Sequence, residues 1–106
     1  MKLTFIYTPT SDLGKSAQFY SQTLGLNERW REGDDTIAFA LPDSDVQLMV
    51  STSPGAPGPM YLVPSVAEWI RAHPTIEIVA PAEDIPGGAV AELLDPSGTS
   101  FYVFDQ

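Results

Sequence analysis

The sequence predicts an α+β fold in which two βαβββ modules form a single domain over residues 1–106. The first observation is a strand pattern, a helical pattern and three further strand patterns in the first half of the chain. The second observation is the same order of elements, more weakly marked, in the second half. We therefore expect module one at residues 1–53 and module two at residues 54–106.

The opening strand and helix are the most clearly marked elements. Residues 3–8 alternate in polarity like a strand, and residues 10–12, Thr-Ser-Asp, end it and can cap a helix. Apolar side chains then recur at steps of three and four positions: Leu13, Ala17, Phe19, Tyr20 and Leu24. Gly25 ends the predicted helix, because glycine tolerates the left-handed backbone that often follows one. Three predicted strands follow at residues 27–31, 36–41 and 46–51.

The second module begins after the most proline-rich stretch of the chain. Residues 53–59 contain three prolines and two glycines, which we interpret as a linker that excludes a helix or a central strand. A predicted strand at 60–63 precedes a helix at 66–73, which begins after Ser65 and ends before Pro74. The remaining elements are predicted strands at residues 76–80, 89–94 and 100–104, and a loop at 81–88.

A shift of the sequence against itself by 53 residues aligns the two modules without gaps. The shift places Asp12 on Ser65, so that the two helix caps coincide, and it also superposes the two last strands. In the middle of the modules, Ile37-Ala38 falls on Val90-Ala91. Identical residues are few, so the repeat is one of pattern and not of sequence identity.

Composition narrows the classes of partner. Fourteen acidic residues against five basic ones give a net charge of −9, which argues against binding to nucleic acids and anionic membranes. The favoured explanation of this charge is that it keeps a small protein soluble, and the alternative is a weak attraction for a cationic small ligand. The absence of cysteine excludes disulfides, thiolate metal sites and a cysteine nucleophile. No apolar run is long enough to span a membrane, and Met1-Lys2 leads directly into a strand without a secretory leader, so we expect a cytoplasmic protein.

Two motifs resemble those of a known family. Residues 11–20, Ser-Asp-Leu-Gly-Lys-Ser-Ala-Gln-Phe-Tyr, with Leu-Gly-Leu at 24–26, resemble the D-L-x-x-S-x-x-F-Y…L-G-L signature of the vicinal oxygen chelate superfamily. This superfamily includes glyoxalase I, extradiol dioxygenases and bleomycin-resistance proteins. Residues 95–98, Asp-Pro-Ser-Gly, resemble its D-P-x-G turn. The resemblance implies two curved mixed sheets around an open cup, a helix on each outer face, and a homodimer.

The same resemblance implies where a metal would bind. Catalytic members hold a divalent metal with His and Glu, seven residues before the Asp of the first signature and seven after the Asp of the D-P-x-G turn. These positions are Phe5 and Tyr102 here, and the 53-residue shift places the other two near Gly58 and Met49. None of the four is a usual ligand for such a metal, so we predict no metal and no cofactor.

Aromatic and methionine side chains take the place of the ligands. The cup that the resemblance implies would be lined by Phe5, Tyr7, Trp30, Met49, Tyr102 and Phe104. Strand alternation places Tyr7 on the same side as Phe5, whereas the register of the short strand that carries Trp30 stays open. Such a lining suits a flat organic ligand, and Gln47, with the parity of Met49, can add an amide hydrogen bond. The alternative is that these side chains fill the cup as an ordinary core.

Two ionisable side chains are considered for a functional role, Glu92 and His73. Glu92, flanked by apolar residues, either faces the cup as a ligand partner or base with a raised pKa, or faces water. His73, the one histidine, is predicted to satisfy the last carbonyls of the second helix and to have no catalytic role.

Three functions remain open from the sequence. The favoured hypothesis is a metal-free protein that binds a cationic or aromatic, drug-like small molecule, as in the bleomycin-resistance branch that the chain resembles. The second is an enzyme of the superfamily (a lyase, isomerase or dioxygenase), using a metal or the weak candidates Glu92 and Tyr102 as acid or base. The third is an interaction module with a filled cup.

Overall fold

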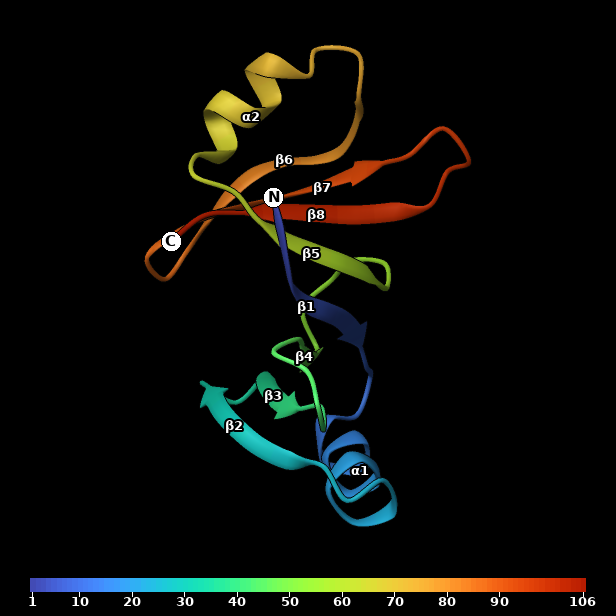
Figure 1. The fold of residues 1–106 in the computed structure, drawn as a ribbon. Coiled ribbons are helices and arrows are strands. Elements are labelled where there is room, and N and C mark those ends of the chain that lie inside the picture. Colours follow the sequence, from blue (N-terminus) through green and yellow to red (C-terminus); the bar gives the residue numbers. More distant parts are fainter. The chain divides into compact units, whose positions relative to one another are not determined.

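The computed structural model describes residues 1–106, which fold as two compact units (Figure 1). We call Phe5–Pro57 the N unit, and Met1–Thr4 together with Gly58–Gln106 the C unit. Each unit carries a mixed four-stranded sheet with a helix packed on one face, so the α+β class and the βαβββ order are confirmed. No helix has the length and hydropathy needed to cross a membrane.

The sheet of the N unit has the strand order β2-β3-β4-β1, in which only β1 and β4 are parallel. Its strands are β1 (Lys2–Pro9), β2 (Asn27–Glu32), β3 (Thr36–Ala40) and β4 (Gln47–Ser51). Helix α1 (Leu13–Gln18) connects β1 to the rest of this sheet and continues into a single π-helical turn, η1 (Phe19–Thr23).

The helix of the N unit begins as predicted and ends differently. The Asp12 carboxylate caps it by accepting a hydrogen bond from the Lys15 backbone N–H at 3.0 Å. The Ser21 hydroxyl donates to the Ala17 carbonyl at 2.7 Å, and the helix widens into η1 at this point. Gly25 then adopts a φ of 70°, the left-handed conformation that ends the segment.

The core of the N unit lies between α1 and one face of the sheet. Ile37, Phe39 and Val50 are almost fully buried there. The helical segment covers them with apolar side chains, among them Leu13, Ala17 and Tyr20. This burial supplies most of the stabilisation of a helix as short as α1, which would be marginal in isolation.

The sheet of the C unit has the strand order β5-β8-β7-β6, and β5 is parallel to β8. Its elements are β5 (Gly58–Leu62), α2 (Val66–Ala72), β6 (Glu77–Ile85), β7 (Gly88–Leu94) and β8 (Ser100–Phe104). The Ser65 hydroxyl caps α2 through the Glu68 backbone N–H at 3.2 Å, as predicted. Trp69 and Ile70 of α2 pack on a buried cluster that includes Leu93.

Two predictions about the C unit are wrong at proline-containing segments. Gly58 and Pro59, assigned to the linker, belong to β5, and residues 81–85, assigned to a loop, continue β6. Proline is tolerated at the start of a strand, where Pro59 lies in β5, and in an irregular edge strand such as β6, which has register shifts on both sides of Ala80. Gly58 is required because a β-carbon there would collide with the Ser100 carbonyl oxygen.

The strand registers support the internal repeat and correct one part of it. Tyr7 lies opposite Met49 in the N unit, and Met60 lies opposite Tyr102 in the C unit, so the first and last strands keep the 53-residue shift. The pairing of β7 with β8 is displaced by one residue relative to that of β3 with β4. As a result Glu92, and not Ala91, occupies the place that Ala38 has in the N unit.

Candidate functional site

The face of the N-unit sheet that turns away from α1 brings together five residues singled out in the sequence. Because Ile37, Phe39 and Val50 point toward α1, their strand neighbours point to the other side. The cross-strand pairs Phe5–Gln47, Tyr7–Met49 and Trp30–Ala38 lie there. We call this set the aromatic face: Phe5, Tyr7, Trp30, Gln47 and Met49.

Trp30 reaches the aromatic face because of a β-bulge. Glu28 lies opposite Phe39, but two residues later Trp30 lies opposite Ala38, so Arg29 is an extra residue without a partner of its own. In a regular ladder Trp30 would lie opposite Ile37 and point toward α1. The bulge therefore decides on which side of the sheet the indole lies.

The Trp30 indole lies across β3 toward strands β4 and β1. The side chains of β3 on this face are Ala38 and Ala40, which are too small to obstruct a ring extending over them. The Trp30 ring meets Phe5 edge-on, with centroids 5.8 Å apart, and its Nε1 donates to Gln47 Oε1 at 3.1 Å. Trp30 stays half-buried, so the indole is held in place and partly open.

The indole also fixes the orientation of the Gln47 amide. An indole N–H can only donate a hydrogen bond, so the carbonyl oxygen of the amide must face it. The Nε2 group, with its two donors, then points away from Trp30. The aromatic face thus presents a positioned hydrogen-bond donor beside aromatic rings.

The face of the C-unit sheet that turns away from α2 carries the other predicted residues. Tyr102 lies opposite Met60 on one side and Glu92 on the other, and Phe104 follows on the same face. All but Glu92 are buried. Glu92 is half-buried, and its Oε2 accepts a hydrogen bond from the Ser100 hydroxyl at 2.8 Å.

Ser100 is a site residue that sequence reasoning missed. Glu92 and Ser100 lie two positions apart across the β7–β8 hairpin, whose turn residues were recognised. The position of the turn sets which residues of the two strands lie opposite each other. This register would have predicted that the Glu92 and Ser100 side chains lie on the same face as diagonal neighbours. The group that this face offers to a partner is therefore a carboxylate, which accepts hydrogen bonds. The corresponding group of the N unit is the Gln47 amide nitrogen, which donates them.

A comparison with protein-family models identifies the family. Residues 2–103 match the model of the Glyoxalase/Bleomycin resistance protein/Dioxygenase superfamily. The chain belongs to this superfamily. The motifs at residues 11–26 and 95–98 predicted this membership from the sequence. Among curated proteins, none matches the chain.

Solved structures of low sequence identity share the superfamily fold. A NAD-dependent benzaldehyde dehydrogenase from Legionella pneumophila has a TM-score of 0.78 at 17% identity, with 95% of this chain and 96% of that chain covered. A superfamily member from Vibrio splendidus 12B01 has a TM-score of 0.65 at 13% identity, with 95% of each chain covered. Methylmalonyl-CoA epimerase from Mycobacterium tuberculosis has a TM-score of 0.65 at 17% identity, with 98% of this chain and 87% of that chain covered. At these identities the likeness shows the fold alone.

The residues at the superfamily's metal-ligand positions do not fit a divalent metal. Phe5 and Met49 lie on the aromatic face and offer a ring and a thioether, and Tyr102 offers a phenol. At Gly58 no side chain fits at all, because of the Ser100 carbonyl. No group of three or more His, Cys, Asp or Glu side chains has the arrangement of a metal site.

His73 has the structural role predicted for it. It follows the last residue of α2, and its Nδ1–H donates to the Trp69 carbonyl at 2.7 Å. Its ring also stacks on the Trp69 indole, with centroids 4.0 Å apart. These contacts satisfy one of the unpaired carbonyls at the end of the helix and involve neither sheet face.

Proposed function

We propose that this superfamily member binds a small, flat organic molecule without a metal ion, and that the aromatic face of the N unit holds it. The Trp30–Gln47 hydrogen bond carries the proposal. It holds a half-buried indole and an amide donor in one fixed arrangement on a strand, where a purely space-filling core would have no use for an oriented amide.

The chemistry of this face defines the ligand. A planar ring would stack on the half-buried Trp30, which the buried Phe5 ring supports from β1, and Met49 would adapt to its outline. A carbonyl oxygen or ring nitrogen of the ligand would accept from Gln47 Nε2. The net charge of −9 would favour a ligand that also bears a positive charge. We include Tyr7, which lies on the same face, among the ligand-binding residues. The ligand contacts predicted for Tyr102 and Phe104, which belong to the C unit, stay predictions.

Trp30 fluorescence can test the proposal. The Trp69→Phe variant leaves Trp30 as the one indole, because the chain has two tryptophans. Planar heteroaromatic compounds are titrated into chelator-treated protein, and at least one should change Trp30 emission saturably. Gln47→Leu should weaken binding of that compound about five- to tenfold through loss of one hydrogen bond.

The matched control is Gln18→Leu, which changes the same residue type on the exposed surface of α1. It should leave binding unchanged. Binding that survives Gln47→Leu unchanged, or that requires an added metal, would contradict the proposed site. A screen in which no planar compound binds would contradict the proposed function itself.

A second candidate function rests on Glu92. This carboxylate is half-buried, accepts a hydrogen bond from Ser100 and has Tyr102 as its cross-strand neighbour, so a general base and a phenol lie side by side. An isomerase that moves a proton on a small carbonyl compound would use these groups. If this function holds, Glu92→Gln will abolish turnover and leave substrate binding intact; turnover that survives the change would exclude this role.

We also propose a homodimer, as the superfamily resemblance implies. The β6 strand is the edge of the C-unit sheet, and its Ile78 and Val79 are 44% and 49% exposed. An edge with adjacent exposed apolar side chains is a site where a second chain can pair. Light scattering should give twice the mass of one chain, and Val79→Lys should shift it to that of a monomer.

A further inference from the structure

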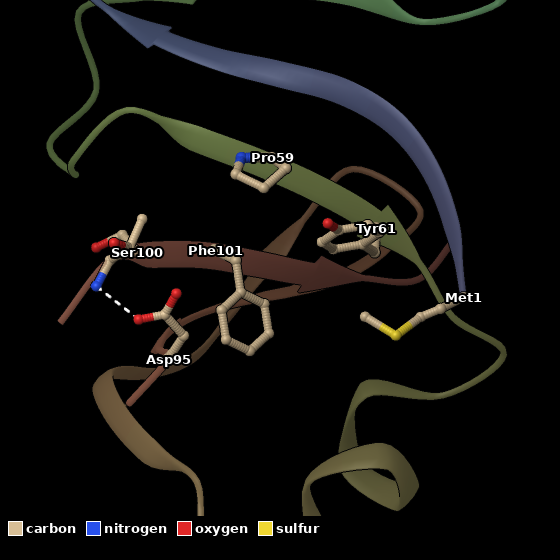
Figure 2. A pocket seen from close by; sticks show the side chains of 7 residues that line it. Met1, Pro59, Tyr61, Asp95, Ser100 and Phe101 are labelled. Carbon is tan, nitrogen blue, oxygen red and sulfur yellow. Dashed lines mark hydrogen bonds between the residues drawn. The ribbon is translucent and has the colours of Figure 1, made fainter. Parts of the chain in front are cut away.

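A shallow pocket in the C unit lies apart from both sheet faces described above. It has a volume of about 290 Å³ and opens over β5 and β8, on the side of the sheet where α2 packs (Figure 2). Tyr61 lies opposite Val103, which is buried under α2, and this fixes the side. Because α2 has only seven residues and packs mainly over β7, this part of the sheet is left uncovered.

Aromatic and apolar side chains form the floor and one wall of the pocket. The rings of Tyr61 and Phe101 meet at 71° with centroids 6.4 Å apart, and both remain half-buried. Pro59 and Met1 add apolar surface beside Tyr61, as Figure 2 shows. Two roughly perpendicular rings present both a ring face and a ring edge to a molecule seated between them.

The Asp95 carboxylate stands at the opposite end of the pocket. Its Oδ1 accepts two backbone hydrogen bonds, from Ser97 N–H at 2.8 Å and Thr99 N–H at 3.0 Å. Both bonds use the same oxygen, and Oδ2 is directed away from the bond drawn in Figure 2. The remaining lining residues, Thr99 and Ser100, are uncharged, and the lining contains no Lys or Arg. Its one cationic group is the amino terminus of Met1, which lies at the other end of the pocket and forms no ion pair with Asp95.

We propose that this pocket binds an organic ammonium cation, with the cation over the rings of Tyr61 and Phe101 and facing the free oxygen of Asp95. Aromatic faces attract alkylated ammonium groups, and a carboxylate at short range adds to that attraction. The charge of −9 raises the local concentration of cations at every such site. This site is independent of the aromatic face and of the ligand proposed for it.

The charge requirement can be tested with a pair of isosteric probes. Choline and 3,3-dimethylbutan-1-ol have nearly the same shape, and only choline is charged. In an NMR titration, choline should shift the ring resonances of Tyr61 and Phe101 saturably, with a dissociation constant at least about fivefold lower than that of the neutral alcohol. Added salt should weaken choline binding, because exposed charges are screened. Equal binding of the two probes, or no saturable shift by choline, would overturn the proposal.

The role of Asp95 can be separated from its structural role. In Asp95→Asn the amide oxygen can still accept from Ser97 and Thr99, whereas the charge on the other oxygen is lost. This variant should keep the wild-type melting temperature and bind choline at least about fivefold more weakly. Asp84→Asn, which removes the same charge from β6 at the far edge of the sheet, should bind choline like the wild type.

A second variant removes the ring in place of the charge. Tyr61→Leu should weaken choline binding and leave any ligand of the aromatic face unaffected, because Tyr61 belongs to the C-unit pocket alone. Wild-type choline affinity in either Asp95→Asn or Tyr61→Leu would overturn the proposal. Loss of choline binding in Asp84→Asn would show that only the overall charge matters, and would overturn it as well.

Discussion

The N unit and the C unit use one backbone plan to present opposite hydrogen-bonding groups. In both, the first strand runs parallel to the last one in equivalent register. The N unit offers an amide donor, Gln47, held by an indole, whereas the C unit offers a carboxylate, Glu92, held by a hydroxyl. The repeated backbone geometry thus sets the positions of the side chains in both units, whereas the residue types at these positions differ.

The difference arises from where each unit places its large side chain. In the N unit the edge strand supplies Trp30, and its neighbour Ala38 is small enough to lie beneath it. In the C unit the edge strand supplies Ala80, and its neighbour is Glu92. The edge strand thus carries the large side chain in the N unit and the small one in the C unit, and the next strand carries the opposite. The small Ala80 leaves the Glu92 carboxylate room to reach the Ser100 hydroxyl. Ser100 occupies the position that Gln47 has in the N unit.

The edge strands differ in how they are protected. The N-unit edge, β2, is rich in charged side chains, and the bulge at Arg29 places Glu28 and Arg31 on one side, where they form an ion pair at 2.9 Å. The C-unit edge, β6, is longer and irregular, and it exposes two adjacent apolar residues. The homodimer proposed above therefore uses the second edge.

The largest expected effect tests whether the two cores are equally important. Phe39→Ala in the N unit and Leu93→Ala in the C unit each remove a side chain that is at most 1% exposed. Each change should lower the free energy of unfolding by about 3–5 kcal/mol, as measured by urea denaturation. The control Phe19→Ala, at an exposed position, should cost under about 1 kcal/mol. A small effect in one core alone would show that the units are not energetically equivalent.

Gly58→Ala tests the closest approach in the C unit. The equivalent position in the N unit is Phe5, where a large side chain is accommodated, whereas at residue 58 even a methyl group meets a backbone carbonyl. We expect a loss of about 3 kcal/mol in urea denaturation, because the backbone cannot move aside as a side chain would. Gly14→Ala, whose β-carbon would make only an ordinary contact, is the control and should be neutral or stabilising. An equally harmless Gly58→Ala would refute the steric explanation.

Removal of one partner from each polar pair compares the two sheet faces directly. Ser100→Ala removes the donor to a carboxylate and should cost about 1.5–3 kcal/mol. Gln47→Leu removes a neutral acceptor and should cost about 0.5–1.5 kcal/mol. Both free energies of unfolding come from denaturation at neutral pH. The reverse order would mean that the Glu92–Ser100 bond is weaker than its geometry suggests.

The smallest expected effect concerns the ion pair that the bulge creates. The hydrogen bond from Arg31 holds the pKa of Glu28 below its usual range. Because the folded pKa is the lower one, the pair's contribution is present above the ordinary glutamate pKa and is lost as the pH falls through the folded value. In an NMR titration, Arg31→Gln should return the Glu28 pKa toward its ordinary value, and Arg71→Gln in α2 should not. An unchanged pKa in Arg31→Gln would contradict the assigned cause.

Much of the fold could be predicted from local signals. The caps at Asp12 and Ser65, the left-handed Gly25 and the extent of β8 lie where the sequence placed them. These features depend on one or a few neighbouring residues, so a linear pattern contains them. Strand alternation also predicted the shared face of Phe5 and Tyr7.

The sequence by itself determined the order of the elements, the core pattern, the superfamily and the residue types at the ligand positions. Only the tertiary structure decided which way Trp30 points, that residues 81–85 form a strand, and that Glu92 meets Ser100. The reason is physical. A bulge, an edge strand and a cross-strand contact are each set by the neighbouring strand, and a one-residue change in register moves a side chain to the opposite face without altering any local propensity.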